Sequence, residues 1–225
     1  MRAPHNLLMA NAHWLPIPLK MALAQLRDLL RSRRTRWLLR RATNRGEIRL
    51  IVGSGHTRYE GWIPTNIDTL NLLDESTWAR FLRPGTVTAI LAEHVWEHLT
   101  PEEGLIAAQT CFRFLRPGGH LRVAVPDGLH PDARYIAEVK PPADGHAVLY
   151  THESLTTLLE AAGLSVQLYE YYDAIGVLHS DPWDPSGGTI LRSKQYNDAH
   201  PDLPFNPVDT SIILDAIRPP AGPRV

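Results

Sequence analysis

A glycine turn and an acidic side chain follow two neighbouring apolar runs of this 225-residue sequence. Residues 47–52 lead directly into Gly53-Ser54-Gly55, and residues 62–67 end at Asp68. Glycine lets the backbone turn tightly and approach a bound molecule where a Cβ would interfere. A carboxylate at the neighbouring strand end can accept hydrogen bonds from both hydroxyls of a ribose. Together the two features predict a site for a nucleotide-type ligand.

The residues after the glycine turn disfavour a dinucleotide. A pyrophosphate is typically held at the N-terminus of a helix that opens with Gly-x-Gly-x-x-Gly. Arg58 occupies the third glycine position here, and only residues 56–61 separate the turn from the next apolar run. Those residues leave little room for such a helix. We therefore expect a ligand without a pyrophosphate.

Four further side chains are candidates for moving a proton at this site. His94 follows the apolar run 86–92, and Asp127 closes the run 120–125. His130 and His146 lie in the irregular stretch that comes next. Histidine titrates near neutral pH, and both residue types serve as general bases. The alternatives remain open: His94 can be structural, and Asp127-Gly128 can be a simple turn.

No residue is assigned to a metal from the sequence. Histidine and carboxylate side chains are suitable ligands, but their spacing in the sequence is not that of a compact metal motif. The residues considered are Asp127, His130, His146, His179 and Asp181. The single cysteine, Cys111, excludes a cysteine-built metal site and an intramolecular disulfide. For His98 we expect a structural or capping role.

Alternating strands and helices must position these side chains. Apolar runs predict strands at 47–52, 62–67, 86–92, 120–125, 164–172 and 210–217. Helical spacing and end signals predict helices over 18–42 and 152–162, and one that begins after Thr100 and ends at Arg116. Strands that alternate with helices are typical of an α/β fold with a mostly parallel sheet. We expect the segments 131–150 and 179–207 to be irregular.

The order of these motifs resembles class I S-adenosylmethionine-dependent methyltransferases, and more narrowly small bacterial methyltransferases with a shortened first loop. The resemblance runs from about Glu47 to Ile217 and rests on five segments: 50–55, 66–68, 93–99, 115–119 and 125–127. It implies a Rossmann-like, doubly wound, mostly parallel sheet with residues 210–217 as an antiparallel edge strand. It also implies an enzyme that uses S-adenosylmethionine as its cofactor.

The resemblance further implies a role for individual residues. Gly53, Ser54 and Gly55 would lie along the methionine part of the cofactor. Asp68 would bind the ribose, and Asp74 would meet the adenine amino group. Glu93 and His94 would lie near the sulfonium and the methyl acceptor. The sequence departs from the usual pattern at Ile51 and Thr57, where many such enzymes have an acidic residue and a third glycine.

The charges are distributed unevenly along the chain. The net charge is −1, yet residues 1–45 hold ten basic residues and one acidic residue. We therefore divide the chain into a basic helical arm, 1–46, and a cofactor-binding domain, 47–225, with an insert at 128–150 and a loop at 179–207. The arm can dock on its own acidic body, which we expect, or contact an anionic membrane peripherally. Nucleic acid is the less expected partner.

The predicted function is methylation of a small-molecule or glycan acceptor, with oxygen favoured as the methylated atom. Nitrogen or carbon acceptors and macromolecular substrates remain alternatives. So does a non-catalytic cofactor-binding or docking module that uses residues 18–45 as its contact. Because the sequence shows no signal peptide or membrane-spanning run and one cysteine, we expect a cytoplasmic protein, either a monomer or a homodimer.

Overall fold

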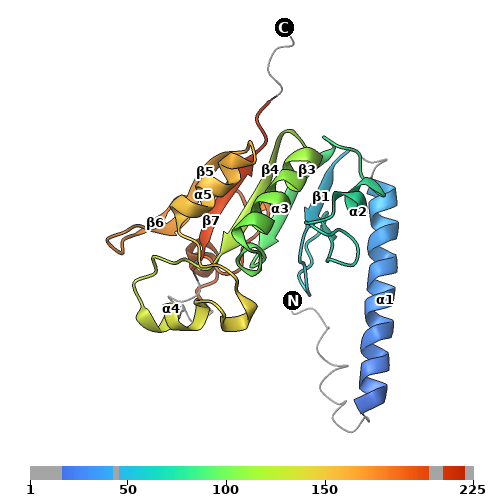
Figure 1. Cartoon of the computed structure of the whole chain (residues 1–225), viewed down its shortest axis with the longest axis horizontal. Coiled ribbons are helices and arrows are strands. Elements are labelled where there is room, and N and C mark those ends of the chain that lie inside the picture. Colours follow the sequence, from blue (N-terminus) through green and yellow to red (C-terminus); the bar gives the residue numbers. More distant parts are fainter. Residues whose placement is uncertain (1–16, 43–45, 203–209, 221–225) are drawn as a thin grey trace.

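A single seven-stranded sheet forms the centre of the molecule in a computed structural model that describes residues 17–42, 46–202 and 210–220 (Figure 1). The strands are β1 (Ile48–Ile51), β2 (Ile63–Pro64), β3 (Val87–Glu93), β4 (Leu115–Val125), β5 (Ser165–Tyr172), β6 (Leu178–Ser180) and β7 (Ile212–Ile217). Their order in the sheet is β2-β1-β3-β4-β7-β5-β6. The helices are α1 (Ile17–Ala42), α2 (Glu75–Ala79), α3 (Pro101–Phe114), α4 (Ala133–Val139), α5 (His152–Ala161) and α6 (Lys194–Ala199).

The strand directions confirm the predicted fold class, a Rossmann-like, mostly parallel sheet. Strand β1 pairs in parallel with β2 and β3, and β3 pairs in parallel with β4. Strand β7 runs antiparallel to both of its neighbours, β4 and β5. One position differs from the expectation: β7 lies inside the sheet, and the antiparallel strand at the edge is β6, which pairs with β5.

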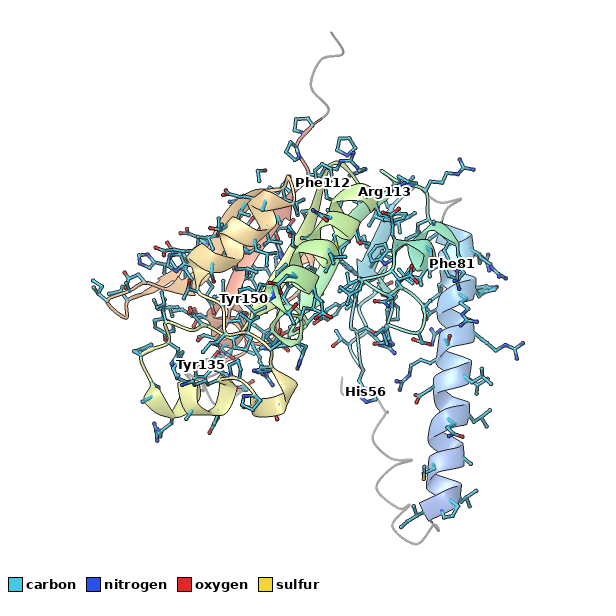
Figure 2. All side chains as sticks on the ribbon, viewed as in Figure 1. His56, Phe81, Phe112, Arg113, Tyr135 and Tyr150 are labelled. Carbon is cyan, nitrogen blue, oxygen red and sulfur yellow. The ribbon has the colours of Figure 1, made fainter. Side chains whose placement is uncertain are left out.

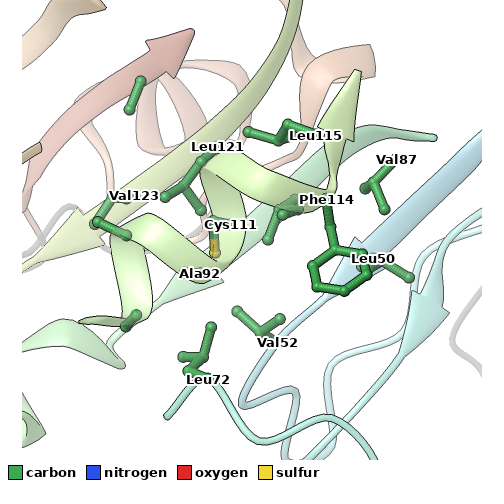
Figure 3. Close-up of a cluster of buried hydrophobic side chains, with 14 of the residues drawn as sticks. Leu50, Val52, Leu72, Val87, Ala92, Cys111, Phe114, Leu115, Leu121 and Val123 are labelled. Carbon is green, nitrogen blue, oxygen red and sulfur yellow. The ribbon is translucent and has the colours of Figure 1, made fainter. Parts of the chain in front are cut away.

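Different segments cover the two faces of the sheet. Figure 1 shows α3 and α5 lying across one face. The core on that side contains the rings of Trp78 and Phe114, which are tilted with their centroids 5.3 Å apart, and Figure 3 shows Leu50 and Val87 near the phenyl ring. The opposite face buries Ile51, Leu91 and Ile213 against Trp183 and Ile190. A segment without a long helix therefore covers the second face.

Buried polar contacts fix that covering segment to the sheet. Arg122 on β4 donates two hydrogen bonds to Asp215 on β7, at 2.8 and 2.9 Å. Its Nη1 also donates to the carbonyl oxygens of Asp184 and Gly188, both at 2.7 Å. Glu170 on β5 accepts from the backbone N–H of Lys194 at 2.9 Å. Burial raises the pKa of Glu170 to about 7.

Strand β2 is shorter than the predicted strand 62–67, and α1 covers it. The N–H of Thr65 still donates to the carbonyl oxygen of Ile51 at 2.7 Å, but Ile67 is 76% exposed beyond it. At the outer edge, Pro64 has no N–H to offer a further strand. The hydroxyl of Thr35 on α1 donates to the carbonyl oxygen of Pro64 at 2.9 Å. Among the described residues, no strand lies outside β2. Helix α1 thus covers the outer edge of β2, with which a further strand would otherwise pair.

Helix α1 matches the helix predicted over 18–42, but only its C-terminal half is buried. Ser32, Thr35, Leu39 and Ala42 share one face and are buried. The N-terminal half extends beyond the body in Figure 1. Its exposed apolar residues are Ile17, Leu19, Met21, Leu26, Leu29 and Leu30. Among the described residues of the arm, the expected docking is therefore observed for residues 31–42. None of the described helices combines the length and hydropathy that crossing a membrane requires.

The two segments predicted to be irregular contain short helices. Asp132 caps α4 by accepting from the N–H of Arg134, and Ser193 caps α6 by accepting from the N–H of Tyr196. Short 3₁₀ turns, η3 (Ala143–Gly145) and η4 (Pro185–Gly187), lie in the same segments. The prediction missed these elements because each is too short to show a helical repeat. Residues 203–207 of the predicted loop lie outside the described residues.

Candidate functional site

The glycine turn after β1 packs against the segment that follows β3. Gly53 and Gly55 both have positive φ, +57° and +50°, which glycine adopts without strain. A Cβ on Gly53 would lie 2.6 Å from Cγ2 of Val95, whereas a Cβ on Gly55 would meet nothing within 4 Å. Ser54 is buried, and its N–H donates to the carbonyl oxygen of Thr65 at 2.9 Å. Gly53 is therefore a packing contact, and Gly55 faces open space.

Positive charge surrounds this turn. Nη1 of Arg58 lies 3.4 Å from the hydroxyl of Ser54 and 3.3 Å from the carbonyl oxygen of Gly55. Burial, followed by the nearby guanidinium groups of Arg31 and Arg34 on α1, lowers the pKa of Arg58. Nη2 of Arg31 also lies 3.4 Å from Nδ1 of His56, which Figure 2 shows on the loop beside α1. The sequence did not reveal this cluster, because its members come from segments far apart in the chain.

A cleft of about 590 Å³ lies between α1 and the ends of β1 and β2. Gly55, Asn66, Asp68 and Thr69 line one side, and residues 28–36 of α1 contribute the other. The N–H of Gly55 donates to Oδ1 of Asn66 at 3.0 Å, which ties the glycine turn to the end of β2. Asp68 is exposed, and within the described part of the chain its carboxylate has no hydrogen-bond or ion-pair partner. The carboxylate is thus available to a ligand.

Two other acidic candidates are engaged in backbone contacts. Oδ1 of Asp74 accepts from the N–H of Ser76 at 3.0 Å and caps α2. Oε1 of Glu93, at the end of β3, accepts from the N–H groups of Leu191 and Arg192 at 2.9 and 3.2 Å. Glu93 therefore holds the 188–193 segment beside the strand end. The expected contacts of both residues with a cofactor stay predictions.

His94 and Glu97 form a hydrogen-bonded pair directly after β3. Nδ1 of His94 lies 2.9 Å from Oε1 of Glu97, whose side chain is 1% exposed. His94 has a φ of +55°, a conformation that non-glycine residues adopt at a cost and often at functional sites. A carboxylate that accepts a hydrogen bond from Nδ1–H fixes the tautomer of the ring, so that Nε2 carries the lone pair. Within the described chain, Nε2 of His94 and Oε2 of Glu97 are buried without a hydrogen-bond partner.

Asp127 and His130 lie together, in a different environment from His94. Both oxygens of Asp127 accept from backbone N–H groups, of Leu129 at 2.8 Å and of Tyr172 at 2.7 Å. Burial is the main cause that raises the pKa of Asp127. The ring of His130 is stacked on that of Tyr135, a residue of α4 labelled in Figure 2, with centroids 4.1 Å apart. These contacts link the segment after β4 to α4 and β5.

His146 lies in the insert and faces the turn after β3. Its ring is 5.0 Å from that of His98, which belongs to the 3₁₀ turn η2 (Trp96–His98). Within the described residues, one group of histidine and acidic side chains is gathered closely enough to hold a metal ion, and it consists of Glu97, His98 and His146. The five residues considered as ligands from the sequence do not form such a group. His179, one of them, contacts Asp173 instead, at 2.9 Å. The sequence did not predict this group because His146 lies 48 residues after His98, and because we expected no chemical role for Glu97 or His98.

Comparison with known proteins gives structural similarity without sequence similarity. No protein-family model and no curated protein matches this chain. A Haloferax volcanii protein solved in complex with the Trm112 methyltransferase activator is 10% identical, with a TM-score of 0.49, over 80% of this chain and 85% of that one. A SAM-dependent methyltransferase from Archaeoglobus fulgidus is 17% identical, with a TM-score of 0.46, over 85% and 94%. A SAM-dependent methyltransferase from Thermotoga maritima is 12% identical, with a TM-score of 0.43, over 88% and 96%.

Proposed function

We propose that this chain is an S-adenosylmethionine-dependent methyltransferase that acts on a hydroxyl group of a small molecule or glycan. The observation that carries the proposal is the packing of the glycine turn against the residue that follows His94. Because a Cβ on Gly53 would overlap Val95, the turn lies next to the His94–Glu97 pair, which supports one site that includes both. In open parallel sheets, ligands bind beyond the carboxyl ends of the strands, where both features lie.

The residues at the ends of β1 and β2 fit the cofactor. The open space at Gly55 would admit the methionine part. Asp68, with its carboxylate unengaged in the described structure, would accept both ribose hydroxyls. Asp74 uses one carboxylate oxygen as a helix cap, and the other would accept from the adenine amino group. The cleft volume of about 590 Å³ lies within the usual range for small-molecule sites.

The charges and the loop length around the turn also fit this cofactor. Arg58 and Arg31 would pair with the carboxylate of its methionine part, since both guanidinium groups lie at the glycine turn. In the described residues, no helix begins between the turn and α2 at Glu75. A pyrophosphate would therefore lack the helix N-terminus that usually binds it. These features favour a single-nucleoside cofactor over a dinucleotide.

His94 would act as the general base. S-adenosylmethionine, when bound, supplies an electrophilic methyl group on a good leaving group. Glu97 holds Nδ1–H of His94 and leaves Nε2 free to accept a proton. A neutral hydroxyl attacks poorly until its proton is removed, so a base at this position favours an oxygen acceptor. Nε2 of His94 would accept the hydroxyl proton, and the cofactor would supply the methyl group, with S-adenosylhomocysteine as the leaving group.

The other predicted bases have weaker support. Both oxygens of Asp127 accept backbone hydrogen bonds, so this carboxylate would have to release a contact to accept a proton. The ring of His130 is buried beside Tyr135 and Tyr172. His146 donates through Nδ1 to the carbonyl oxygen of Val139 and belongs to the insert. We keep His94 as the base and treat a catalytic role for these three residues as an open prediction.

Calorimetry with S-adenosylhomocysteine tests the cofactor assignment. Asp68→Ala should weaken binding by about 1.5–3 kcal/mol, the contribution of hydrogen bonds to a charged group. Glu60→Ala is the matched control, because Glu60 is an exposed acid of the same loop region without a hydrogen-bond partner in the described structure. Equal affinities of the two variants would refute the ribose assignment. Binding of NADH at micromolar concentration would refute the choice of nucleotide.

Turnover with a panel of hydroxyl acceptors tests the base. His94→Gln should lower turnover by about 10²-fold, the usual size of a general-base effect, and leave the affinity for S-adenosylhomocysteine unchanged. Asp127→Asn is the comparison, since it keeps the shape of the other predicted base. Near-normal turnover in His94→Gln would refute its role. A parallel loss of cofactor affinity and turnover would identify His94 as a cofactor contact.

A second candidate function uses the exposed half of α1. Leu26, Leu29 and Leu30 are each more than half exposed, and the same helix presents several arginines. A basic helix with exposed leucines would suit peripheral contact with an anionic membrane through attraction of its arginines to the lipid headgroups. Vesicles that contain anionic lipids should then bind the full chain at low salt and release it at high salt. Binding that is absent, or equal on neutral vesicles, would contradict this role.

A further inference from the structure

Two imidazole rings in the insert region have their tautomers fixed by backbone carbonyls. Nδ1 of His98 contacts the carbonyl oxygen of Gly145 at 3.3 Å, and Nδ1 of His146 contacts that of Val139 at 2.8 Å. A carbonyl oxygen can only accept, so Nδ1 of each ring carries the hydrogen. Each Nε2 therefore has a lone pair. Metal-binding histidines are typically oriented by this kind of hydrogen bond.

A buried carboxylate oxygen lies beside these rings without a partner. Glu97 is 1% exposed, and its Oε1 contacts His94. Its Oε2 is buried and has no hydrogen-bond partner within the described residues. An unsatisfied carboxylate oxygen is costly to bury, and a bound cation would remove that cost. This observation is independent of the ring orientations and points to a ligand at the same place.

The three side chains are close enough to share one ion. Ligand atoms from Glu97, His98 and His146 all lie within 4.8 Å of one another. In a tetrahedral zinc site with bonds of about 2.0 Å, ligand atoms are about 3.3 Å apart. Small side-chain rotations would therefore close the site. Two imidazoles and one carboxylate are a ligand set that zinc and related divalent transition metals prefer over magnesium or calcium.

We propose that Glu97, His98 and His146 bind a divalent transition-metal ion, with Zn²⁺ the best fit. Three protein ligands leave a fourth position open to water. The ion would join η2 to the insert, which already meets it where the N–H of Ala147 donates to the carbonyl oxygen of Glu97 at 2.7 Å. Because Glu97 also holds His94, the metal would lie one carboxylate away from the proposed base. The metal proposal stands on this cluster alone and does not depend on methyl transfer.

Metal titration of the untagged full chain tests the proposal. After chelator treatment and dialysis, the protein should bind one equivalent of Zn²⁺ in competition with a chromophoric chelator. His98→Asn and His146→Asn should each lower the affinity at least tenfold. His179→Asn is the control, because His179 belongs to the set that the structure does not gather. Circular dichroism of each variant confirms that it is folded.

A second measurement guards against variants that lose affinity through misfolding. Zn²⁺ should raise the melting temperature of the wild type and of His179→Asn, and should leave that of His146→Asn unchanged. Failure of the wild type to bind stoichiometric Zn²⁺ would overturn the proposal. So would an affinity that folded His98→Asn and His146→Asn retain. Neither outcome bears on cofactor binding, which calorimetry with S-adenosylhomocysteine reports separately.

Discussion

The contact between Gly53 and Val95 predicts a measurable effect of a single methyl group. Gly53→Ala places a non-glycine residue at a φ of +57°, a strain of about 1–2 kcal/mol. The new Cβ would lie 2.6 Å from Cγ2 of Val95, well inside the usual carbon–carbon separation of about 3.5–4.0 Å. Overpacking of this kind costs about 1–3 kcal/mol. The free energy of unfolding should therefore fall by about 2–5 kcal/mol.

Gly55 provides a matched control within the same turn. Its φ of +50° is almost the same, but a Cβ there would meet nothing within 4 Å. Gly55→Ala should therefore lose only the backbone part, about 1–2 kcal/mol. Urea unfolding of both variants, followed by fluorescence, measures the difference directly. The difference between the two glycines reports the packing contact alone.

A double variant separates strain from overlap. Gly53→Ala combined with Val95→Ala removes the overlapping methyl groups and keeps the positive φ. Its destabilisation should be smaller than the sum of the single variants by about 1–3 kcal/mol. Strict additivity, or equal effects of alanine at Gly53 and Gly55, would refute the packing of the turn against the segment after β3. The proposed joint site would then lose its main support.

Three further predictions concern stability. Leu39→Ala, in the buried face of α1, should lower the free energy of unfolding by about 2–5 kcal/mol. Leu29→Ala, on the exposed half, should change it by less than about 0.5 kcal/mol. Equal, small effects of the two variants in urea unfolding would contradict the docking of α1. Asp215→Asn leaves the buried Arg122 without its charge partner and should cost about 3–5 kcal/mol, measured in the same way; a loss below 1 kcal/mol would contradict the buried pair. Because burial raises the pKa of Glu170 from 4.5 to about 7, its protonated form favours the folded state, and the stability it contributes at low pH is lost as the pH rises through that interval. Urea midpoints at pH 5 and pH 8 should therefore show a larger fall for the wild type than for Glu170→Gln, and parallel changes would contradict the raised pKa.

Local patterns in the sequence were sufficient to predict the main elements. Apolar runs bounded by glycine, proline and acidic residues located the parallel strands, and the capping box at Thr100 located α3. The predicted strand 62–67 was longer than β2 because the chain leaves the sheet after Thr65, although the apolar run continues to Ile67. The caps at Asp132 and Ser193 were visible signals. They were insufficient to predict helices of one or two turns without a repeating apolar face.

Contacts that depend on the folded backbone account for most of what the sequence did not predict at the candidate site. His94 was predicted as a strand-end residue, yet its partner Glu97 became evident only from the 3₁₀ turn that follows β3. The approach of His146 to His98 depends on how the insert folds back. Arg58 gains a role only through the arginines of α1. The spacing of residues along the chain does not predict these contacts.

The position of β7 has a consequence for how the molecule is assembled during synthesis. This strand follows β5 and β6 in sequence but lies between β4 and β5 in the sheet. Until β7 has been synthesised, the β5–β6 hairpin has no strand through which to join β4, and its own neighbouring edge stays open. Unpaired strand edges are where nascent chains aggregate. The late strand would therefore act as the closing element of the sheet, and a ribosome-bound chain stalled before Ile212 should depend most on chaperones.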